Sequence, residues 1–349
     1  DAIPFRDAIH KRLTALFDDH KHGLPWKKNG GDYFYENDGL RNQSVLYRTR
    51  SLDAAPEVFL DPNALSDDGT VALTGVFFSH DGRYAAYTIS RSGSDWTEIY
   101  VMDAATRQLL PDHIEWAKFT GADWQGDGFY YSAYPTPEKG KEFSNANENH
   151  RIYFHRLGTP QSEDTLVYEE PQEPLKFFSA SVPDDESMIF VFGAGQGLGN
   201  SLMVRSLKDA GAEWKVMSAT QDYEVSVLDV IDGTIYLYTN YGAPRYRLMT
   251  ATLDNPAMEQ WKELVPQQKG VLTGVDFTGP DRMILTYDVD ASNHTYLYTL
   301  GGKEIREIKL PSIGSVGFSA SRKHPEVFYA FTSFAYPSAL YRYDVEKDE

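Results

Sequence analysis

The chain has 349 residues, a formal net charge of −18 at pH 7 and no cysteine. The acidic balance argues against nucleic acid as a partner, because phosphates are bound by Lys and Arg patches, and the lack of cysteine rules out disulfide bonds and thiol catalysis. No run of 18 apolar residues is present, so no membrane-spanning segment and no membrane partner are expected, while the aromatic content of 14% suits sheet faces that pack on one another.

One helix is predicted, near the N-terminus, over Pro4–Lys21. Pro4 suits the first turn of a helix, and five apolar side chains recur at spacings of three and four residues, so they share one face. These side chains are Phe5, Ile9, Leu13, Leu16 and Phe17. Because an apolar helix face requires a partner, the helix is expected to pack on another part of the protein.

The segment Val58–Leu110 indicates the fold of the remainder. Its β-rich runs predict an antiparallel meander with strands at 72–78, 83–90, 97–103 and 107–110. Asp81-Gly82 separates the first two runs, and Asp-Gly is a strong hairpin signal because Gly adopts positive φ without a steric cost. One unit of the chain is therefore a small sheet.

Two short patterns recur in phase along the whole chain. The first is an aliphatic residue followed by Tyr or Met, with copies at Leu46-Tyr47, Ile99-Tyr100, Ile152-Tyr153, Leu202-Met203, Leu248-Met249, Leu297-Tyr298 and Leu340-Tyr341. The second is a turn signal about twenty residues earlier, at Asn29-Gly30, Asp81-Gly82, Asp127-Gly128, Asp184-Asp185, Asp232-Gly233, Pro280-Asp281 and His324-Pro325. Successive copies are about 43 to 53 residues apart, which is typical of propeller blades.

These repeats predict an all-β fold, a seven-bladed β-propeller of four-stranded antiparallel blades over residues 23–349, with one short N-terminal helix in residues 1–22. A ring of blades buries its core between neighbours, so the length fits one domain. The last repeat offers only three strand-like runs before Glu349, so blade 7 is expected to be incomplete.

Two segments interrupt the β pattern. Pro135–His150 is polar, charged and poor in β formers, which predicts a long, mobile surface loop on one rim of the ring. Gly193–Gly199 matches no dinucleotide-binding fingerprint and opens no helix, so it is interpreted as a flexible loop between strands. The sequence does not specify a role for this glycine loop.

Motifs that carry chemistry are weak in this sequence. Gly317–Ser321 is the nearest match to the nucleophile elbow of serine hydrolases, but it lacks the last Gly and lies in a predicted hairpin. The acid pairs Asp67-Asp68 and Asp184-Asp185 lie at predicted turns, where Asp caps backbone donors. No catalytic residue is therefore predicted in this chain.

The histidines likewise predict no metal site. The close pairs, His20 with His22 and His150 with His155, have no carboxylate or cysteine neighbour of the kind a metal site requires, so surface or packing roles are expected. No cofactor is predicted either.

Several long segments together identify a family. They are YENDGLRNQSVLYRTRSL, FLDPNALSDDGTVAL, FSHDGRYAAYTISRSGSDWTEIYVMD, RIYFHRLGTPQSEDTLVYE and FTSFAYPSALYRYD. In these segments, and nearly end to end, the chain resembles the propeller domain of prolyl oligopeptidase, a serine endopeptidase of the α/β-hydrolase class.

The resemblance implies a two-domain enzyme whose propeller covers the active site, excludes folded proteins and admits short peptides, which are cut after proline. The Ser, Asp and His of such enzymes lie in a C-terminal half, so the catalytic domain is expected to be absent here and the chain alone inactive. Residues 1–22 are then a helix left from the peptidase-domain segment. The implied partners are the missing α/β-hydrolase domain and proline-containing oligopeptides, and the implied location is the cytoplasm, with the periplasm as the alternative.

Two substrate-binding residues are implied by the same resemblance, Phe119 in the motif AKF and Phe177 in EEPQEPLKFF. In the family, a Phe at the first position lines the pocket for the third residue before the cut. Periodicity alone favours another interpretation for Phe119, a strand over 116–120 with residues 117 and 119 on one face, which would make it a core residue of a blade.

Two other functions remain open from the residues themselves. One is a free-standing propeller that binds a peptide or protein partner, and the other is an enzyme that uses a propeller as its own active site. A self-sufficient propeller is expected to complete its last blade, so the strand content of blade 7 distinguishes these alternatives from a domain of a larger peptidase.

Overall fold

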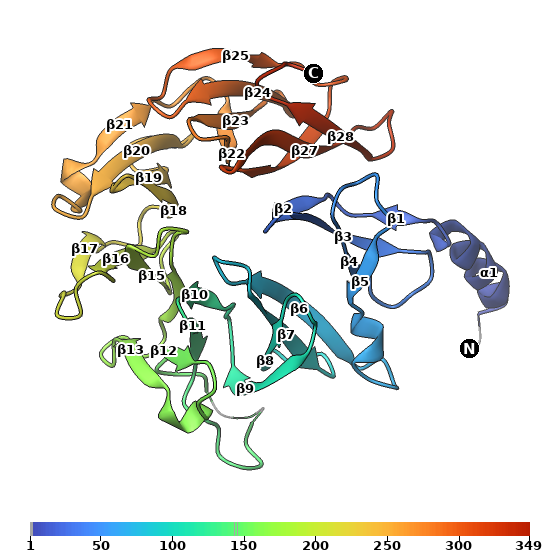
Figure 1. Cartoon of the computed structure of the whole chain (residues 1–349), viewed down its shortest axis with the longest axis horizontal. Helices are drawn as coiled ribbons and strands as arrows, with labels where there is room; N and C mark the ends of the chain where they lie inside the picture. The colour runs from blue at the N-terminus through green and yellow to red at the C-terminus, as the bar shows by residue number, and fades with distance from the viewer. Residues whose placement is uncertain (1–2, 143, 145) are drawn as a thin grey trace.

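The computed structural model describes residues 3–142, 144 and 146–349. In this part of the chain, one α-helix precedes a series of antiparallel sheets. The sheets stand around a common centre in chain order, so that the colour runs around the ring from blue to red (Figure 1). The prediction of an all-β propeller with one N-terminal helix is confirmed. No helix among these residues is long and apolar enough to span a bilayer.

The first half of the ring contains four strand groups. The first group is β1 (Lys21–His22), β2 (Trp26–Lys28), β3 (Gly31–Asn37), β4 (Val45–Thr49) and β5 (Glu57–Leu60), and the second is β6 (Val71–Phe78), β7 (Tyr84–Arg91), β8 (Thr97–Asp103) and β9 (Leu109–Ala117). The third is β10 (Asp123–Gln125), β11 (Gly128–Ala133), β12 (Arg151–Arg156) and β13 (Thr165–Glu169), and the fourth is β14 (Phe177–Ser181), β15 (Met188–Ala194), β16 (Ser201–Ser206) and β17 (Lys215–Ser218).

The second half contains three groups. They are β18 (Val225–Ile231), β19 (Thr234–Thr239), β20 (Arg247–Thr252) and β21 (Lys262–Val265), then β22 (Val271–Thr278), β23 (Arg282–Val289), β24 (Ser292–Thr299) and β25 (Glu304–Ile308), and finally β26 (Ser315–Ser321), β27 (His324–Thr332) and β28 (Ala339–Asp344). Short 3₁₀ turns occur at η1 (Pro62–Ala64), η2 (Gln161–Glu163) and η3 (Met258–Gln260).

The predicted count of seven blades fits this arrangement. The second and third groups are formally one eight-stranded sheet, but a single residue pair, Ala117 with Ala133, joins them. Every other group is a sheet of its own in the described residues. Hydrophobic clusters fill the spaces between adjacent groups, as in the cluster that joins Phe190 of β15 to Leu237 of β19. This is how a ring of blades buries its core.

The recurring dipeptide marks the third strand of each group. In the first and the third to sixth groups, the register of the third strand with the fourth shifts between the two residues of the dipeptide. A bulge at this point increases the local twist of the blade. The aliphatic residue of the pair is at most 1% exposed in the first six groups. The sequence repeat thus reflects a repeated packing position between blades.

The seventh group differs, since β28 is its last strand in the described part of the chain. Leu340, its dipeptide residue, is 41% exposed because no fourth strand covers it there. The first and seventh groups share no strand among the described residues, so side chains connect them. Lys27 of β2 lies 3.1 Å from Asp32 of β3 and 2.9 Å from Glu326 of β27, with its ammonium 5.0 Å from the ring of Phe328.

Two strand predictions need correction. The fourth strand of the second group is β9, not 107–110, because Arg107 has a φ of 63° and its N–H donates to Asp103 O, closing a tight turn before the strand begins. The predicted turn at His324-Pro325 lies within β27, and the hairpin turn is formed by Arg322 and Lys323. Both errors misplace a boundary by a few residues and leave the topology unchanged.

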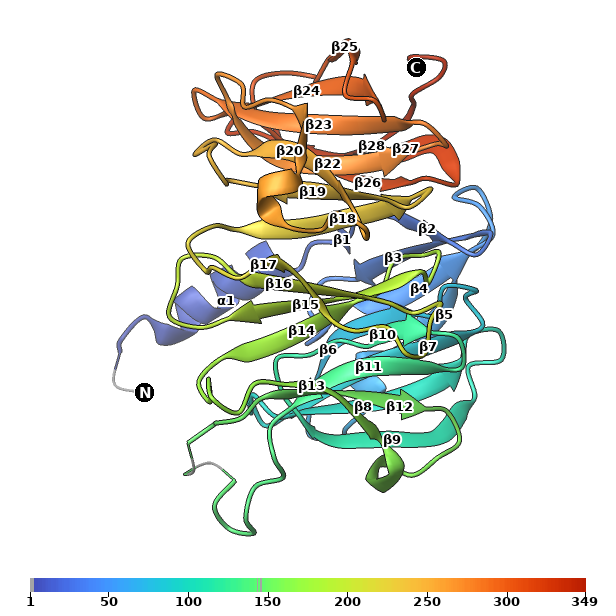
Figure 2. The same cartoon turned by 90° about the vertical axis from the view of Figure 1, so that its left-hand side faces the viewer.

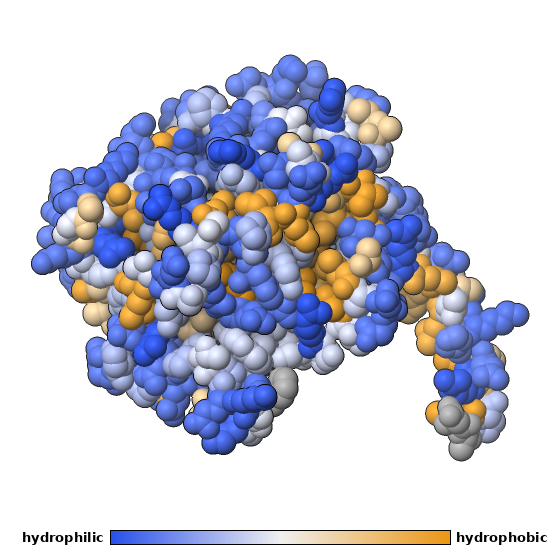
Figure 3. Space-filling model, turned by 60° about the horizontal axis from the view of Figure 1, so that its bottom comes forward, coloured by the Kyte–Doolittle hydropathy of each residue, from blue (hydrophilic) through white to orange (hydrophobic). Residues whose placement is uncertain are grey.

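The helix α1 (Arg6–Phe17) is shorter than predicted and leaves its apolar face uncovered. All five side chains that define that face are exposed in the described structure. The helix projects from the body of the ring, with hydrophobic side chains along it (Figure 3). The expectation that this face needs a partner therefore stands.

The antiparallel order gives the ring two distinct rims. The first strand of each group is the innermost one, and it runs from one rim to the other. The rim where it begins also carries the loops between second and third strands. The rim where it ends carries the turns between first and second strands. We call them the loop rim and the turn rim. Residues 135–150 and 193–199 are on the loop rim. Figure 2 shows α1 on the same side of the ring as the long loop that follows β11.

Candidate functional site

Phe119 lies on the loop rim outside any strand. β9 ends at Ala117 and β10 begins at Asp123, and both Trp116 and Phe119 have positive φ, 58° and 53°. A positive φ in a non-glycine residue breaks strand alternation, so the predicted strand over 116–120 is wrong. Phe119 is 52% exposed, which also excludes the interpretation as a core residue of a blade.

Lys118 occupies the inward position instead. It is 7% exposed, and its ammonium lies 3.6 Å from Asp95 and 5.0 Å from the ring centroid of Trp96. The same ammonium lies 5.4 Å from the ring of Phe119. The charged side chain that strand alternation assigns to the surface therefore supports the exposed aromatic ring beside it.

The two implied substrate-binding residues come together in the structure. Phe177, the first residue of β14, is 41% exposed, and its ring centroid is 5.8 Å from that of Phe119. Tyr134 and His150 complete the group, with ring centroids 6.5 and 6.4 Å from Phe119. We call these four residues the aromatic cluster. It presents two half-exposed phenyl rings on the loop rim.

His150 holds the cluster in place. It is buried, it accepts a hydrogen bond from the N–H of Phe178 at 2.8 Å through Nδ1, and its Nε2 donates to Lys118 O at 2.9 Å. Burial lowers the pKa of His150, so the imidazole stays neutral, as this pattern of one acceptor and one donor requires. The sequence predicts that His150 ends a surface loop, and it does not reveal this role because the contacts join three separate segments.

Further apolar side chains lie on the same rim. Leu175 precedes β14, Leu198 is in the glycine loop, and Phe334 and Tyr336 lie between β27 and β28, all exposed. The glycine loop is a loop between strands, as interpreted, but its end is anchored by a hydrogen bond from Gly199 N to Gln221 O of 2.8 Å. A Cβ on Gly199 would lie 1.9 Å from Tyr223 O, so this close approach requires glycine.

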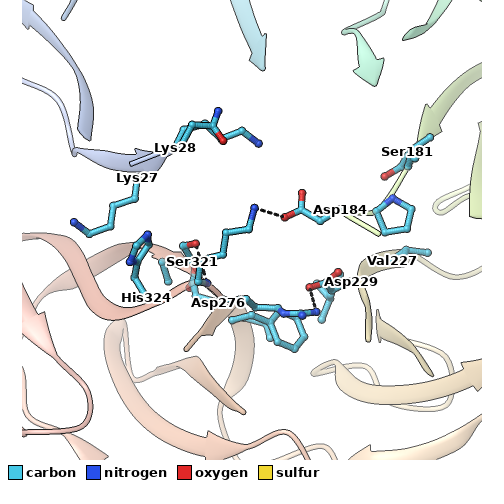
Figure 4. Close-up of a pocket in the computed structure, with 18 of the residues that line it drawn as sticks. Lys27, Lys28, Ser181, Asp184, Val227, Asp229, Asp276, Ser321 and His324 are labelled. Atoms are coloured by element: carbon cyan, nitrogen blue, oxygen red, sulfur yellow. Dashed lines mark hydrogen bonds and ion pairs between the residues drawn. The ribbon is translucent and has the colours of Figure 1, made fainter. Parts of the chain in front are cut away.

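A cavity of about 450 Å³ opens at the turn rim, at the centre of the ring (Figure 4). Five of the strand groups contribute to its lining, which includes Lys27, Lys28, Ser181, Asp184, Val227, Asp229, Asp276, Ser321 and His324. β14 begins at Phe177 and ends at Ser181, just before Asp184. The aromatic cluster and this cavity therefore lie at opposite ends of the innermost strands.

Charged side chains dominate the cavity. Asp184 Oδ1 lies 3.0 Å from His80 Nδ1, and its Oδ2 lies 3.8 Å from the ammonium of Lys323. The hydrogen bond with His80, assisted by nearby cations, lowers the pKa of Asp184 to about 2. Arg322 and Asp229 form a second pair at 3.1 Å. Asp184 is at a turn as predicted, but it also contributes a fixed negative charge to the cavity.

Asp276 differs from the other acids of the cavity. Burial raises its pKa to about 7, and within the described residues no charged partner offsets this effect. A carboxyl group of this kind changes its charge near neutral pH. Gly317–Ser321, the weak nucleophile-elbow match, lies in β26, and the next element is β27 rather than a helix, as predicted.

Comparisons with known proteins agree with the architecture. The family model described as "Prolyl oligopeptidase, N-terminal beta-propeller domain" matches residues 1–349. The prolyl endopeptidase of Elizabethkingia meningoseptica is 38% identical over 98% of this chain and 48% of its own length, and prolyl oligopeptidase A of Galerina marginata (strain CBS 339.88) is 30% identical over 98% and 51%. The chain spans about half the length of the curated relatives it matches.

Solved structures show the same fold. A chain from a structural and mechanistic study of two prolyl endopeptidases superposes with a TM-score of 0.85 at 28% identity, covering 99% of this chain and 50% of that one. Prolyl oligopeptidase B from Galerina marginata, bound to a 35mer hydrolysis and macrocyclization substrate, gives 0.89 at 25% identity over 98% and 51%. The chain belongs to the family of prolyl oligopeptidase N-terminal β-propeller domains.

Proposed function

We propose that this chain is the substrate-gating propeller of a proline-specific serine oligopeptidase that cuts short peptides after proline. Family membership supports the peptidase assignment, and the relatives that carry it are named prolyl endopeptidase or prolyl oligopeptidase. Because the chain covers about half of those relatives, the propeller acts together with an α/β-hydrolase domain that the relatives' remaining length accommodates.

The observation that carries the proposal is the exposed apolar surface of the loop rim. Phe119, Phe177, Leu198 and Phe334 lie on this rim without cover in the described structure, and the uncovered face of α1 lies on the same side of the ring. Large exposed apolar areas of this kind mark interaction surfaces. The catalytic domain docks on the loop rim, and the aromatic cluster forms one wall of the peptide pocket between the two domains.

Gating depends on the cavity at the turn rim and on the peptide pocket at the loop rim. The cavity at the turn rim is lined by charged side chains from five blades, and its volume of about 450 Å³ is far too small for a folded protein to pass the centre. The peptide pocket is accordingly closed on the propeller side to all but short, extended chains. Phe119 and Phe177 then contact the substrate through apolar burial, which favours a bulky residue at the third position before the cut.

The chain alone is expected to be inactive, since the Ser, Asp and His of the family belong to the other domain. Incubation with a fluorogenic Gly-Pro substrate and a serine-reactive phosphonate probe tests this expectation. The isolated chain should give no turnover and no labelling, and the full-length enzyme should give both. Turnover with stoichiometric labelling of the isolated chain would refute the assignment.

The gating role is tested by comparing the full-length enzyme with its catalytic domain alone. Short proline-containing peptides should be cut by the full-length enzyme, whereas an unfolded protein with exposed prolines should be cut only after the propeller is removed. If the full-length enzyme cuts both equally, the propeller does not gate. Tight binding of a peptide by the isolated chain would instead favour a free-standing binding propeller.

A further inference from the structure

His20, His22 and Glu36 converge where the segment after α1 joins the first blade. β1 pairs with β3 so that His22 lies directly opposite Glu36. His20 Nε2 is 2.8 Å from Glu36 Oε1, and His22 Nδ1 is 3.4 Å from Glu36 Oε2. The two imidazole rings are 4.3 Å apart. The premise that this histidine pair has no carboxylate neighbour is therefore wrong, because the neighbour is close in space and 14 to 16 residues away in sequence.

The spacing of the ligand atoms matches that of a metal site. One atom from each of the three residues lies within 4.8 Å of the other two. Zinc bonds of about 2.0 to 2.1 Å at tetrahedral angles place ligand atoms roughly 3.4 Å apart. Small side-chain rotations are enough to reach that geometry, and all three side chains have solvent access that permits them.

Lys21 does not compete for this position. Side chains of neighbouring residues in a strand point to opposite sides, so the side chain of Lys21 lies on the side opposite to those of His20 and His22. Its ammonium donates to the backbone oxygens of Phe17, Asp19 and Gly39. The carboxylate of Glu36 is thus the charged group that faces both imidazoles, and a divalent cation between them satisfies all three groups at once.

We propose that His20, His22 and Glu36 form a site for a divalent transition metal of the Zn²⁺ class, with water in the remaining coordination positions. A site of two imidazoles and one carboxylate favours such ions over Mg²⁺ or Ca²⁺, because Mg²⁺ and Ca²⁺ prefer oxygen ligands alone. The ion would join the segment that follows α1 to the second strand of the first blade. It would fix the start of the propeller at the point where the exposed helix leaves the ring.

Isothermal titration calorimetry, with ZnCl₂ added to the chelator-treated chain, measures zinc binding at this site. One ion per chain is expected, and His20→Ala, His22→Ala or Glu36→Gln should each weaken binding by about tenfold or more. Because the three side chains are on the surface, these variants should fold, which circular dichroism checks. Titration with MgCl₂ should give no heat of site binding.

His294→Ala provides the matched control. His294 also faces a glutamate, Glu307, at 3.7 Å on a strand surface, but within the described residues it is not part of a three-ligand group. Its replacement should leave zinc binding unchanged. A zinc-edge anomalous difference map of crystals grown with the ion should place one peak between His20 and His22. No binding by the native chain, or binding by the His20→Ala and His22→Ala variants as tight as that of the native chain, would overturn the proposal.

Discussion

Phe119 shows how a backbone conformation selects what a side chain does. Its positive φ turns the ring outward toward Phe177, and Lys118 takes the buried position beside it. The phenyl ring is thereby available to a ligand, while its removal leaves the blade core intact. This separation between binding and stability is what makes the residue testable by mutation.

In the full-length enzyme, Phe119→Ala should lower kcat/KM for substrates with a bulky third residue before the cut. Loss of about 1 to 3 kcal/mol of apolar burial corresponds to a decrease of about 5- to 150-fold. Shorter substrates should be cut nearly as well as before, and the thermal stability of the propeller should hardly change. Equal losses for both substrate lengths, or unfolding of the variant, would mean that Phe119 is not a pocket residue.

Asp276 should make the stability of the propeller depend on pH. Burial raises its pKa from 3.8 to about 7, so the folded state holds the proton more tightly than the unfolded state. The resulting stabilisation is complete below pH 3.8 and is lost as the pH rises through about 7. Asp276→Asn cannot ionise, so at pH 8 it should exceed the native chain in free energy of unfolding by about 4 kcal/mol.

Urea unfolding at pH 5 and pH 8 measures this effect. The difference in free energy of unfolding between the Asp276→Asn variant and the native chain should be larger at pH 8 than at pH 5, because only the native side chain becomes charged in the cavity. Asp281→Asn, at an exposed turn, is the control. Its free energy of unfolding should differ from that of the native chain by the same small amount at both pH values. A pH-independent difference for Asp276→Asn would contradict the assigned titration.

At the level of strands and turns, the blades repeat the same packing arrangement, with local exceptions. The third strand carries the aliphatic residue that packs between blades, and the bulge beside it twists the blade. Turns and third strands were predictable because Asp-Gly and the dipeptide are local signals. Fourth strands were less predictable, since β9 is set by its pairing with β8 and begins only after the left-handed turn at Arg107.

The loop that contains residues 135–149 should be the first site of proteolysis. Most of its described residues are exposed and outside any strand, and Trp96 Nε1 holds it at one point by donating to Glu142 O at 2.9 Å. Positions 143 and 145 lie outside the described residues. Limited trypsin digestion should cut first at Lys139 or Lys141, and the adjoining β12 should be protected because His150 anchors its start. First cleavage elsewhere would contradict this prediction.

At the scale of the whole molecule, a partly buried cation, Lys27, lies where the first and seventh blades meet. Lys27 pairs with Asp32 in its own blade and with Glu326 across the junction. Lys27→Met leaves the buried Asp32 without this partner and should lower the free energy of unfolding by about 1 to 3 kcal/mol. Hydrogen exchange should accelerate in β2 and β26, which line this junction, before other strands.

Lys323→Met is the matched control for that prediction. Lys323 also pairs with an acid, Asp184, but its side chain is largely exposed at the turn rim, so its loss should change stability by less than about 1 kcal/mol. Equal effects of the two substitutions, or unchanged exchange in β2, would show that the junction is held together by apolar packing rather than by Lys27.

The fold class, the repeat length, the N-terminal helix and the family could be predicted from the residues alone, because these depend on local turn chemistry, on periodicity and on long matching segments. The sequence could not determine which distant residues meet. Glu36 lies beside His20 and His22 because β1 pairs with β3. Contacts between separate segments place His150 against Lys118 and Phe178, and Asp112 and Asp164 on either side of the buried His155. Such contacts depend on the folded ring, because strand pairing and the packing of neighbouring blades bring together side chains that no spacing along the chain relates.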